Sequence, residues 1–237
     1  MPAAAWGMLL TLSVLWGGSF LFIRIAVVDM PTLTVVLVRV GLAAAVLLAF
    51  ARLTGVALPR DGRSWRDYLV QGILNNIVPF VLIVWGQKTI GAGLASILNA
   101  TTPIFGVVIA HLLTTDDKAT PLKAAGVAIS FVGVAVLVGV DALVGVGDHL
   151  LAELACLGAA LSYGFSGLWS RRFRGRPPVA TAAGQLTCST LVFTPVVFLV
   201  DPPWQHAAPG LPAIAAVIAL AFFCTAVGYI LFFRLTT

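Results

Sequence analysis

Charged residues are so scarce in this chain, and apolar residues so continuous, that its charges could not cover the surface of a water-soluble globule. Of its 237 residues, 60% are hydrophobic and 10% are charged, with 14 Lys and Arg against 9 Asp and Glu. An average soluble domain carries about 25% charged residues. This composition indicates a polytopic helical membrane protein. It argues against a disordered chain, a nucleic-acid-binding domain and a secreted disulfide scaffold.

The number of helices follows from the length of the chain. A transmembrane helix needs about 20 mostly apolar residues, so a chain of 237 residues with short loops holds eight spans at most. The uncharged stretches predict helices over 5–28, 32–53, 68–87, 91–113, 121–140, 150–170, 179–200 and 212–233. Transmembrane β-strands would alternate apolar and polar residues, and a run such as 132–140 shows no alternation. The expected fold class is therefore an all-α integral membrane protein.

The basic residues predict the orientation of these helices. One set of alternate loops and chain ends holds eleven Lys and Arg, namely Arg52, Arg60, Arg63, Arg66, Lys118, Lys123, Arg171, Arg172, Arg174, Arg176 and Arg234. The opposite set holds only Arg24 and Lys88. Cytoplasmic loops of membrane proteins carry the excess of Lys and Arg, so both chain ends are expected in the cytoplasm of a bacterial cell. A cleaved signal peptide would begin with a positively charged segment, but no Lys or Arg precedes Arg24. The first helix is therefore expected to remain in the protein as a membrane span.

No pattern of reactive side chains indicates an enzyme or a metal site. Cys156, Cys188 and Cys224 fall within predicted helices, where they are expected to pack as small apolar residues. The three His residues lie near helix ends or in loops and do not cluster. We expect no cofactor, no metal and no nucleic-acid partner, and a lipid bilayer as the surroundings of the chain.

An internal repeat organises the sequence. At an offset of 147 residues, Trp16 corresponds to Tyr163 and Ser19 to Ser166, and the Arg and Pro residues that follow also match without a gap. Five helices separate the corresponding elements, and an odd number places the second copy upside down in the membrane. An inverted repeat of this kind is typical of secondary transporters. We predict two copies, 5–140 with five helices and 150–237 with three.

The same offset indicates an incomplete second copy. The counterparts of the fourth and fifth helices would follow Thr237, so eight helices are present where two full copies would have ten. The alternatives are a truncated product, a natural eight-helix variant, and a chain that pairs with a copy of itself or with a partner that supplies two helices.

Several segments resemble one family. The first helix contains WGGSF at 16–20, and the stretch 85–103 reads WGQKTIGAGLASILNATTP. The fifth helix has GVAISFVGV at 126–134, and the eighth has GYILFFR at 228–234. These segments resemble EamA-type transporters of the drug/metabolite transporter superfamily. The resemblance implies ten helices in two inverted five-helix halves and a central substrate cavity enclosed by both.

Polar residues inside the membrane are costly, so they are candidates for contact with substrate. Arg39 is the only full charge well inside a predicted span. It is either a structural residue whose side chain reaches polar groups, or an anchor for a carboxylate or phosphate, which a guanidinium can bind with two donors.

Further polar candidates lie at similar depth in other helices. Asn75, Asn76 and Asn99 either bond neighbouring helices or face a cavity. Pro103 removes the helical hydrogen bond to the Asn99 carbonyl, so a loosened turn with a free acceptor is expected there, as in a gate. Gln185 lies one position from the repeat counterpart of Arg39 and is expected to face the same space.

The repeat itself supplies the remaining candidates. Trp16 and Tyr163, together with Ser19, are expected either to line a central cavity or to pack between helices. Gly17, Gly18 and Gly164 are expected to allow close contact between helices.

The leading functional hypothesis is a bacterial inner-membrane transporter that exports a small metabolite, amino-acid-like or drug-like, by alternating access. The alternatives are an inactive fragment or partial subunit and, remotely, an intramembrane enzyme. An enzyme would need clustered catalytic side chains within the spans, and none is found.

Overall fold

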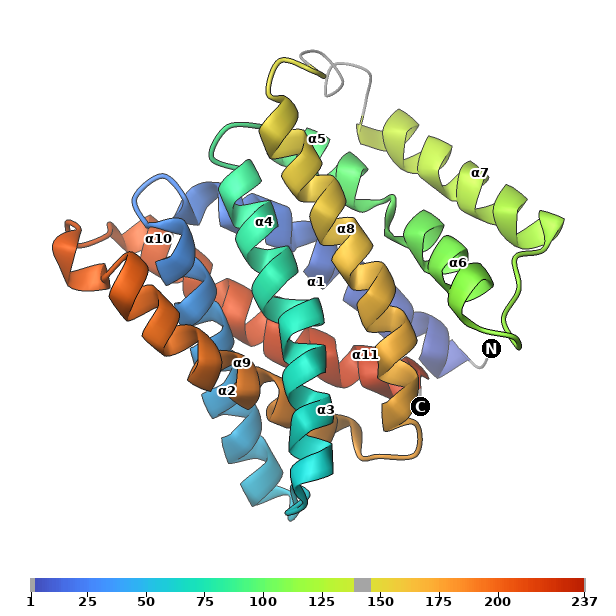
Figure 1. The fold of residues 1–237 in the computed structure, drawn as a ribbon. Coiled ribbons are helices and arrows are strands. Elements are labelled where there is room, and N and C mark those ends of the chain that lie inside the picture. Colours follow the sequence, from blue (N-terminus) through green and yellow to red (C-terminus); the bar gives the residue numbers. More distant parts are fainter. Residues whose placement is uncertain (1–2, 139–145, 237) are drawn as a thin grey trace.

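The computed structural model describes residues 3–138 and 146–236. This part of the chain forms helices joined by loops and contains no strand (Figure 1). The α-helices are α1 (Ala3–Ala26), α2 (Thr32–Leu53), α3 (Gly62–Gly72), α4 (Val78–Gly86), α5 (Ala92–Asn99), α6 (Thr102–Leu113), α7 (Pro121–Val138), α8 (Leu150–Ser170), α9 (Pro178–Val200), α10 (Leu211–Ala219) and α11 (Gly228–Thr236). Two π-helical segments, η1 (Ile73–Ile77) and η5 (Leu220–Val227), join α3 to α4 and α10 to α11. Short 3-10 turns, η3 (Arg171–Phe173) and η4 (Pro203–Gln205), follow α8 and α9.

The predicted all-helical membrane fold is confirmed. Among the described residues, seven helical stretches are long and apolar enough to cross a membrane, and α7 contributes a shorter apolar stretch, Pro121–Val134. The last two residues of the fifth expected span, 139 and 140, lie outside the described residues. The N and C labels in Figure 1 lie close together at one end of the bundle, while α7 lies at its edge, next to α5 and α6.

The third expected span begins too late. It was expected to start at Tyr68, but α3 begins at Gly62. Asp61 caps the helix, because its carboxylate accepts hydrogen bonds from the backbone N–H of Ser64 at 2.8 Å and from the Ser64 hydroxyl at 2.7 Å. Asp67, which the sequence placed in a loop, is therefore a buried residue of α3.

The fourth expected span is interrupted. Its two halves are α5, which ends at Asn99, and α6, which begins at Thr102. Pro103 has no N–H and cannot continue the hydrogen-bond ladder of α5, so the helix restarts at this point.

Helices α2 and α9 form the most extensive interface in the fold. Small side chains of both helices are completely or almost completely buried there, among them Ala43 and Ala44 of α2 and Ala182 and Ala183 of α9. Small residues let helix backbones approach closely inside a membrane, where van der Waals contact provides much of the attraction between helices. This pair forms the centre of the main hydrophobic core.

The boundaries of the helices repeat at the offset found in the sequence. Residues 3–26 of α1 correspond to 150–173, which are the residues of α8 and η3. Residues 32–53 of α2 correspond to 179–200, within one residue of the bounds of α9. The π-helical segment η1 corresponds to 220–224, which lies inside η5. The described segments 3–138 and 146–236, called the two halves below, therefore share even the position of an uncommon local distortion.

Contacts between the halves also occur in reciprocal pairs. Helix α4 packs on α8, and their counterparts α11 and α1 pack on each other. Likewise α3 packs on α9, and α10 packs on α2. Such exchange of partners is expected where a two-fold relation connects two similar halves, with α2 and α9 next to the axis.

Candidate functional site

A cavity of about 370 Å³ lies between the two halves. This volume falls within the range of pockets that hold small molecules. Its walls come from helices of both halves, and the lining residues are Trp16, Ser19, Phe20, Ile23, Arg39, Asn75, Phe80, Ile83, Asn99, Thr102, Pro103, Tyr163, Ser166, Gly167, Tyr229 and Phe232.

Most of the residues proposed from the sequence meet at this cavity. Trp16, Ser19, Arg39, Asn75, Asn99, Pro103 and Tyr163 line it, whereas Asn76 and Gln185 do not. Three pairs of repeat counterparts line the cavity, namely Trp16 with Tyr163, Ser19 with Ser166 and Phe20 with Gly167. The cavity therefore lies where corresponding parts of the two halves meet.

Arg39 supplies the charge of the cavity wall. Its side chain is buried, and its Nε donates a hydrogen bond to Thr225 Oγ1 at 2.8 Å. The guanidinium carbon lies 3.6 Å from the centre of the Phe80 ring, a cation–π contact. Thr225 belongs to η5, so the π-helical segment of the second half fixes the orientation of an arginine from the first. Of the described residues that line the cavity, none is Asp or Glu.

Asn75 lies in η1 and connects the cavity wall to two other helices. Its Oδ1 accepts a hydrogen bond from the hydroxyl of Ser166 at 2.9 Å, and its Nδ2 donates to Gln185 Oε1 at 3.4 Å. Gln185 is fully buried in α9 and lies behind the wall rather than in it. Its position next to the counterpart of Arg39 indicated the correct region, but its amide bonds to Asn75 and does not reach the cavity.

Asn76 was expected beside Asn75 but points elsewhere. Its Nδ2 donates to Ser189 Oγ at 2.8 Å, and its Oδ1 accepts a hydrogen bond from the Tyr229 hydroxyl at 2.6 Å. Neighbouring residues of a helix project in different directions, so two adjacent side chains do not face the same space. Asn76 thus joins the two halves, and Tyr229, which does line the cavity, is held in place by this bond.

The interruption between α5 and α6 brings a helix N-terminus to the cavity. Thr102 and Pro103 begin α6 and are lining residues. The Asn99 carbonyl was expected to be a free acceptor, but it accepts a hydrogen bond from the Thr102 hydroxyl at 2.7 Å. The free polar atom at this point is instead the Asn99 side-chain Oδ1, which is buried and has no hydrogen-bond donor in the described part of the chain.

The aromatic character of the cavity was only partly evident from the sequence. Phe20, Phe80, Tyr229 and Phe232 line it in addition to Trp16 and Tyr163. The Trp16 ring packs against Phe232 with centroids 5.5 Å apart, and its Nε1 donates to the Cys224 carbonyl at 3.1 Å. The repeat offset could have identified Phe20 through its proximity to Ser19. No comparable signal distinguishes Phe80 from the many other apolar residues of its helix.

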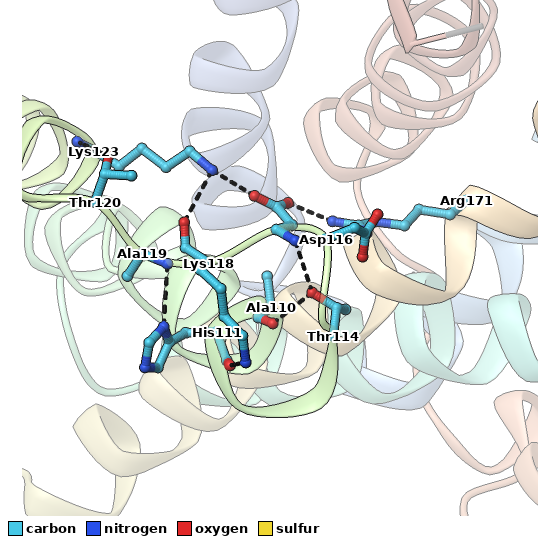
Figure 2. A network of polar contacts seen from close by, with 10 residues as sticks. Ala110, His111, Thr114, Asp116, Lys118, Ala119, Thr120, Lys123 and Arg171 are labelled. Atoms are coloured by element: carbon cyan, nitrogen blue, oxygen red, sulfur yellow. Dashed lines mark hydrogen bonds and ion pairs between the residues drawn. The ribbon is translucent and has the colours of Figure 1, made fainter.

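A cluster of charges connects η3, directly after α8, to the loop between α6 and α7 (Figure 2). The Asp117 carboxylate accepts hydrogen bonds from Lys123 Nζ and Arg171 Nη2, and Arg171 Nη1 lies 3.4 Å from Asp116 Oδ2. The hydrogen bond from Lys123, followed by the charges of Lys123 and Arg171, lowers the pKa of Asp117 below its ordinary value. Asp117 is therefore ionised at neutral pH, and the loop is held against the end of α8.

A second, smaller cavity of about 260 Å³ is partly lined by this cluster. Its lining includes Asp117, Lys118 and Lys123 together with Pro103, which also lines the central cavity. The two cavities therefore share a lining residue near the start of α6.

The described residues contain no cluster of His, Cys, Asp and Glu that could hold a metal ion. The three cysteines are buried and free, as their positions in apolar helices suggested.

A family model described as the EamA-like transporter family matches residues 4–139 and 150–237. The uncharacterized transporter YoaV of Bacillus subtilis is 23% identical over 163 residues, which are 69% of this chain and 56% of that protein. The uncharacterized inner membrane transporter YedA of Escherichia coli K12 is 30% identical over 131 residues, or 55% of this chain and 42% of YedA. The chain thus matches about half the length of these two relatives.

A longer match comes from a protein described as a probable terminal-alkyne amino-acid exporter of Streptantibioticus cattleyicolor. It is 26% identical over 234 residues, which cover 97% of this chain and 75% of that protein. Among solved structures, a chain titled only "Crystal structure of protein" superposes with a TM-score of 0.73 at 18% identity, covering 98% of this chain and 78% of that one. At this identity the superposition shows a shared fold.

Proposed function

Because this chain belongs to the EamA-like transporter family, and is thus a multi-pass membrane protein of transporter type, we propose that it is a secondary transporter which exports small metabolites by alternating access. The observation that carries the proposal is the cavity between the two halves, whose walls contain corresponding residues of both. In secondary transporters built from repeats, substrate binds at the interface of the repeats, and access alternates as one repeat moves against the other.

The two copies are proposed to be 5–140 and 150–237, with the second inverted. The common offset of helix boundaries and the reciprocal packing of α4 on α8 and α11 on α1 support this arrangement. An axis that exchanges the two halves lies in the membrane plane when an odd number of spans separates them. The distortions η1 and η5 would then lie at equivalent depths on opposite sides of the axis.

The orientation is proposed to place both chain ends in the cytoplasm. Supporting evidence is the excess of Lys and Arg in one set of loops. Arg24, an exception to this excess, has a structural role, because its Nη1 donates to the Gln87 carbonyl at 2.8 Å. Alkaline phosphatase, which is active only in the periplasm, should be inactive when fused after Thr237, and an active fusion would contradict the orientation.

The substrate is proposed to be amino-acid-like or drug-like. The name of the Streptantibioticus relative supports an amino-acid-like substrate, and the inner membrane named for YedA supports a location in the inner membrane. The cavity agrees with a small molecule in its volume and in its mixture of aromatic and polar walls.

An efflux screen in cells that lack related transporters tests this function, with two glycine variants as the decisive comparison. A side chain at Gly167 would project into the cavity, because no atom lies within 4 Å of a Cβ built there. Gly167→Phe should therefore abolish efflux. Gly17 has equally open surroundings but lies outside the cavity wall, so Gly17→Phe should transport normally. Equal efflux by the two variants at equal membrane levels would contradict the proposal.

The homodimer or partner subunit, one of the alternatives that the sequence left open, stays a prediction. Light scattering of the purified chain in detergent should give the mass of more than one copy if it pairs with itself, and the mass of a single copy would contradict the homodimer.

A further inference from the structure

We infer that the central cavity recognises a small organic carboxylate with an apolar or aromatic body, and that Arg39 binds its carboxylate group. This inference rests on the proposed function, because it names the class of molecule that the transporter carries. A carboxylate borne by an amino acid belongs to this class.

The first observation is the hydrogen bonding of Arg39. Its Nε is bonded to Thr225, and its guanidinium lies over Phe80, but within the described part of the chain neither Nη group has a hydrogen-bond partner. Arg39 is only 5% exposed, and it is a lining residue of the cavity. Its free donors are thus directed at the cavity rather than at the protein or at bulk water. A guanidinium with both Nη groups free can bind the two oxygens of a carboxylate.

The second observation is the charge balance of the cavity wall. Arg39 contributes one positive charge, and the described lining residues include no Asp or Glu to offset it. A buried charge without a partner is costly, and an anionic ligand removes this cost while a cationic ligand increases it. The wall therefore discriminates against amines and favours anions.

The third observation is the start of α6. This twelve-residue helix begins at Thr102 and Pro103 in the cavity wall, so the positive end of its dipole is directed at the cavity. Interrupted transmembrane helices present their N-termini to anionic substrate groups in this way. The amides of Ile104 and Phe105 already bond to the Thr101 carbonyl, so the dipole contributes an attraction and Arg39 the specific contact.

The other lining residues of the cavity determine what kind of molecule can bear the carboxylate group. The cavity that Arg39 lines is also lined by apolar and aromatic side chains, among them Phe20, Ile83, Tyr163 and Phe232, and Phe80 lies against the guanidinium itself. A small inorganic anion would leave this surface in contact with water. An apolar or aromatic body would cover it, which favours an organic carboxylate over phosphate or sulfate.

Three probes with the same aromatic body test the inference. Binding to the purified chain is measured by titration calorimetry for phenylacetate, for phenylacetamide and for phenethylamine, which carry a negative, a zero and a positive charge. Wild type should bind phenylacetate about tenfold or more tightly than phenylacetamide, as the loss of a charged hydrogen-bonded pair predicts, and phenethylamine most weakly. Equal or tighter binding of the amide or the amine, or no binding of phenylacetate by the folded chain, would overturn the inference.

Variants of Arg39 test whether this residue causes the preference for phenylacetate. In Arg39→Gln the affinity for phenylacetate should fall to that for phenylacetamide, and the unchanged affinity for the amide shows that the cavity is intact. Arg39→Lys, with a point charge in place of the planar fork, should retain part of the preference. Ile83→Ala serves as the control, since it should weaken all probes alike and leave their ratio unchanged. A preference for phenylacetate that persists in Arg39→Gln would mean that another group recognises the carboxylate.

These results separate the inference from the proposed function. If the chain exports a cationic metabolite and Gly167→Phe abolishes this efflux, the proposed transport function is supported and the inferred carboxylate substrate is refuted. Tight binding of phenylacetate without efflux of any metabolite would support the carboxylate site and contradict the transport function.

Discussion

Gly17 and Gly164 correspond in the repeat, yet their surroundings differ. A Cβ built on Gly164 would lie 2.9 Å from Ile109 Cδ1 and 3.1 Å from Phe105 Cβ, so α8 and α6 are in direct contact there. Gly17 has no atom within 4 Å of such a Cβ, and Gly18 has only one, at 3.9 Å. The expectation that all three glycines allow close helix contact is confirmed for Gly164 and is wrong for the other two. Sequence shows that a glycine is present, whereas its neighbours depend on the whole fold.

This difference predicts opposite responses to the same substitution. Gly164→Ala should destabilise the protein by about 1–3 kcal/mol, because the added methyl group forces α6 and α8 apart. Gly17→Ala should change stability by less than about 0.5 kcal/mol, or slightly stabilise the exposed helix. Thermal unfolding of both variants in the same detergent measures the difference. A fall in Tm as large for Gly17→Ala as for Gly164→Ala would contradict the packing at Gly164.

At the scale of elements, the sequence predicted what depends on local composition. The apolar stretches predicted the positions of the helices well, because a membrane span requires a length of apolar residues that can be counted. The early start of α3 was missed because the amphipathic segment 62–67 is too polar to count as a span. The cap formed by Asp61 and Ser64 was the available signal.

The π-helical segments were not predictable from the sequence, because π-helices have no simple residue pattern. One of them, η1, contributes a polar side chain to the wall of the cavity. Asn75 lines it and Asn76 bonds Tyr229 and Ser189 instead, although both lie in η1. The sequence predicted that the two asparagines lie in one helical span, and the direction of each side chain required the structure.

The charge cluster belongs to the same scale, since it holds the α6–α7 loop against the end of α8. Asp117→Asn should raise hydrogen exchange of the loop 114–120 several-fold, because the carboxylate contacts both Lys123 and Arg171. Asp116→Asn is the matched control. Asp116 is largely exposed and, among the described residues, contacts Arg171 alone, so exchange should change little. Equal exchange in the two variants would show that Asp117 does not hold the loop.

The pH dependence of this contact follows from the same carboxylate. Its pKa is lowered in the folded protein, so the contact is present above the ordinary Asp pKa and is lost only as the pH falls through the lower, folded value. Between pH 7 and pH 5 the protection of the loop amides against hydrogen exchange should stay constant, after correction for the pH dependence of the intrinsic exchange rate. A loss of protection in that range would mean that a different group titrates.

At the scale of the whole molecule, residues of both halves line the central cavity, and the repeat in the sequence pointed to corresponding residues as candidates for such a cavity. The repeat left open whether Trp16, Tyr163 and Ser19 line a cavity or pack between helices, and all three line the cavity. It could not predict that Arg39 bonds to Thr225, because the two residues are not related by the offset and meet only when α2 packs against η5.

The central claim, that the cavity opens alternately to the two sides of the membrane, is tested most directly by the accessibility of one cysteine. Gly167→Cys is made in a chain whose buried cysteines Cys156, Cys188 and Cys224 are replaced by Ala, with Gly17→Cys outside the cavity as control. A membrane-impermeant maleimide is added to intact cells and, separately, to inside-out vesicles. Alternating access predicts that the cysteine at 167 is labelled from both sides and the cysteine at 17 from neither. Labelling of position 167 from one side only, with or without substrate, would contradict the account.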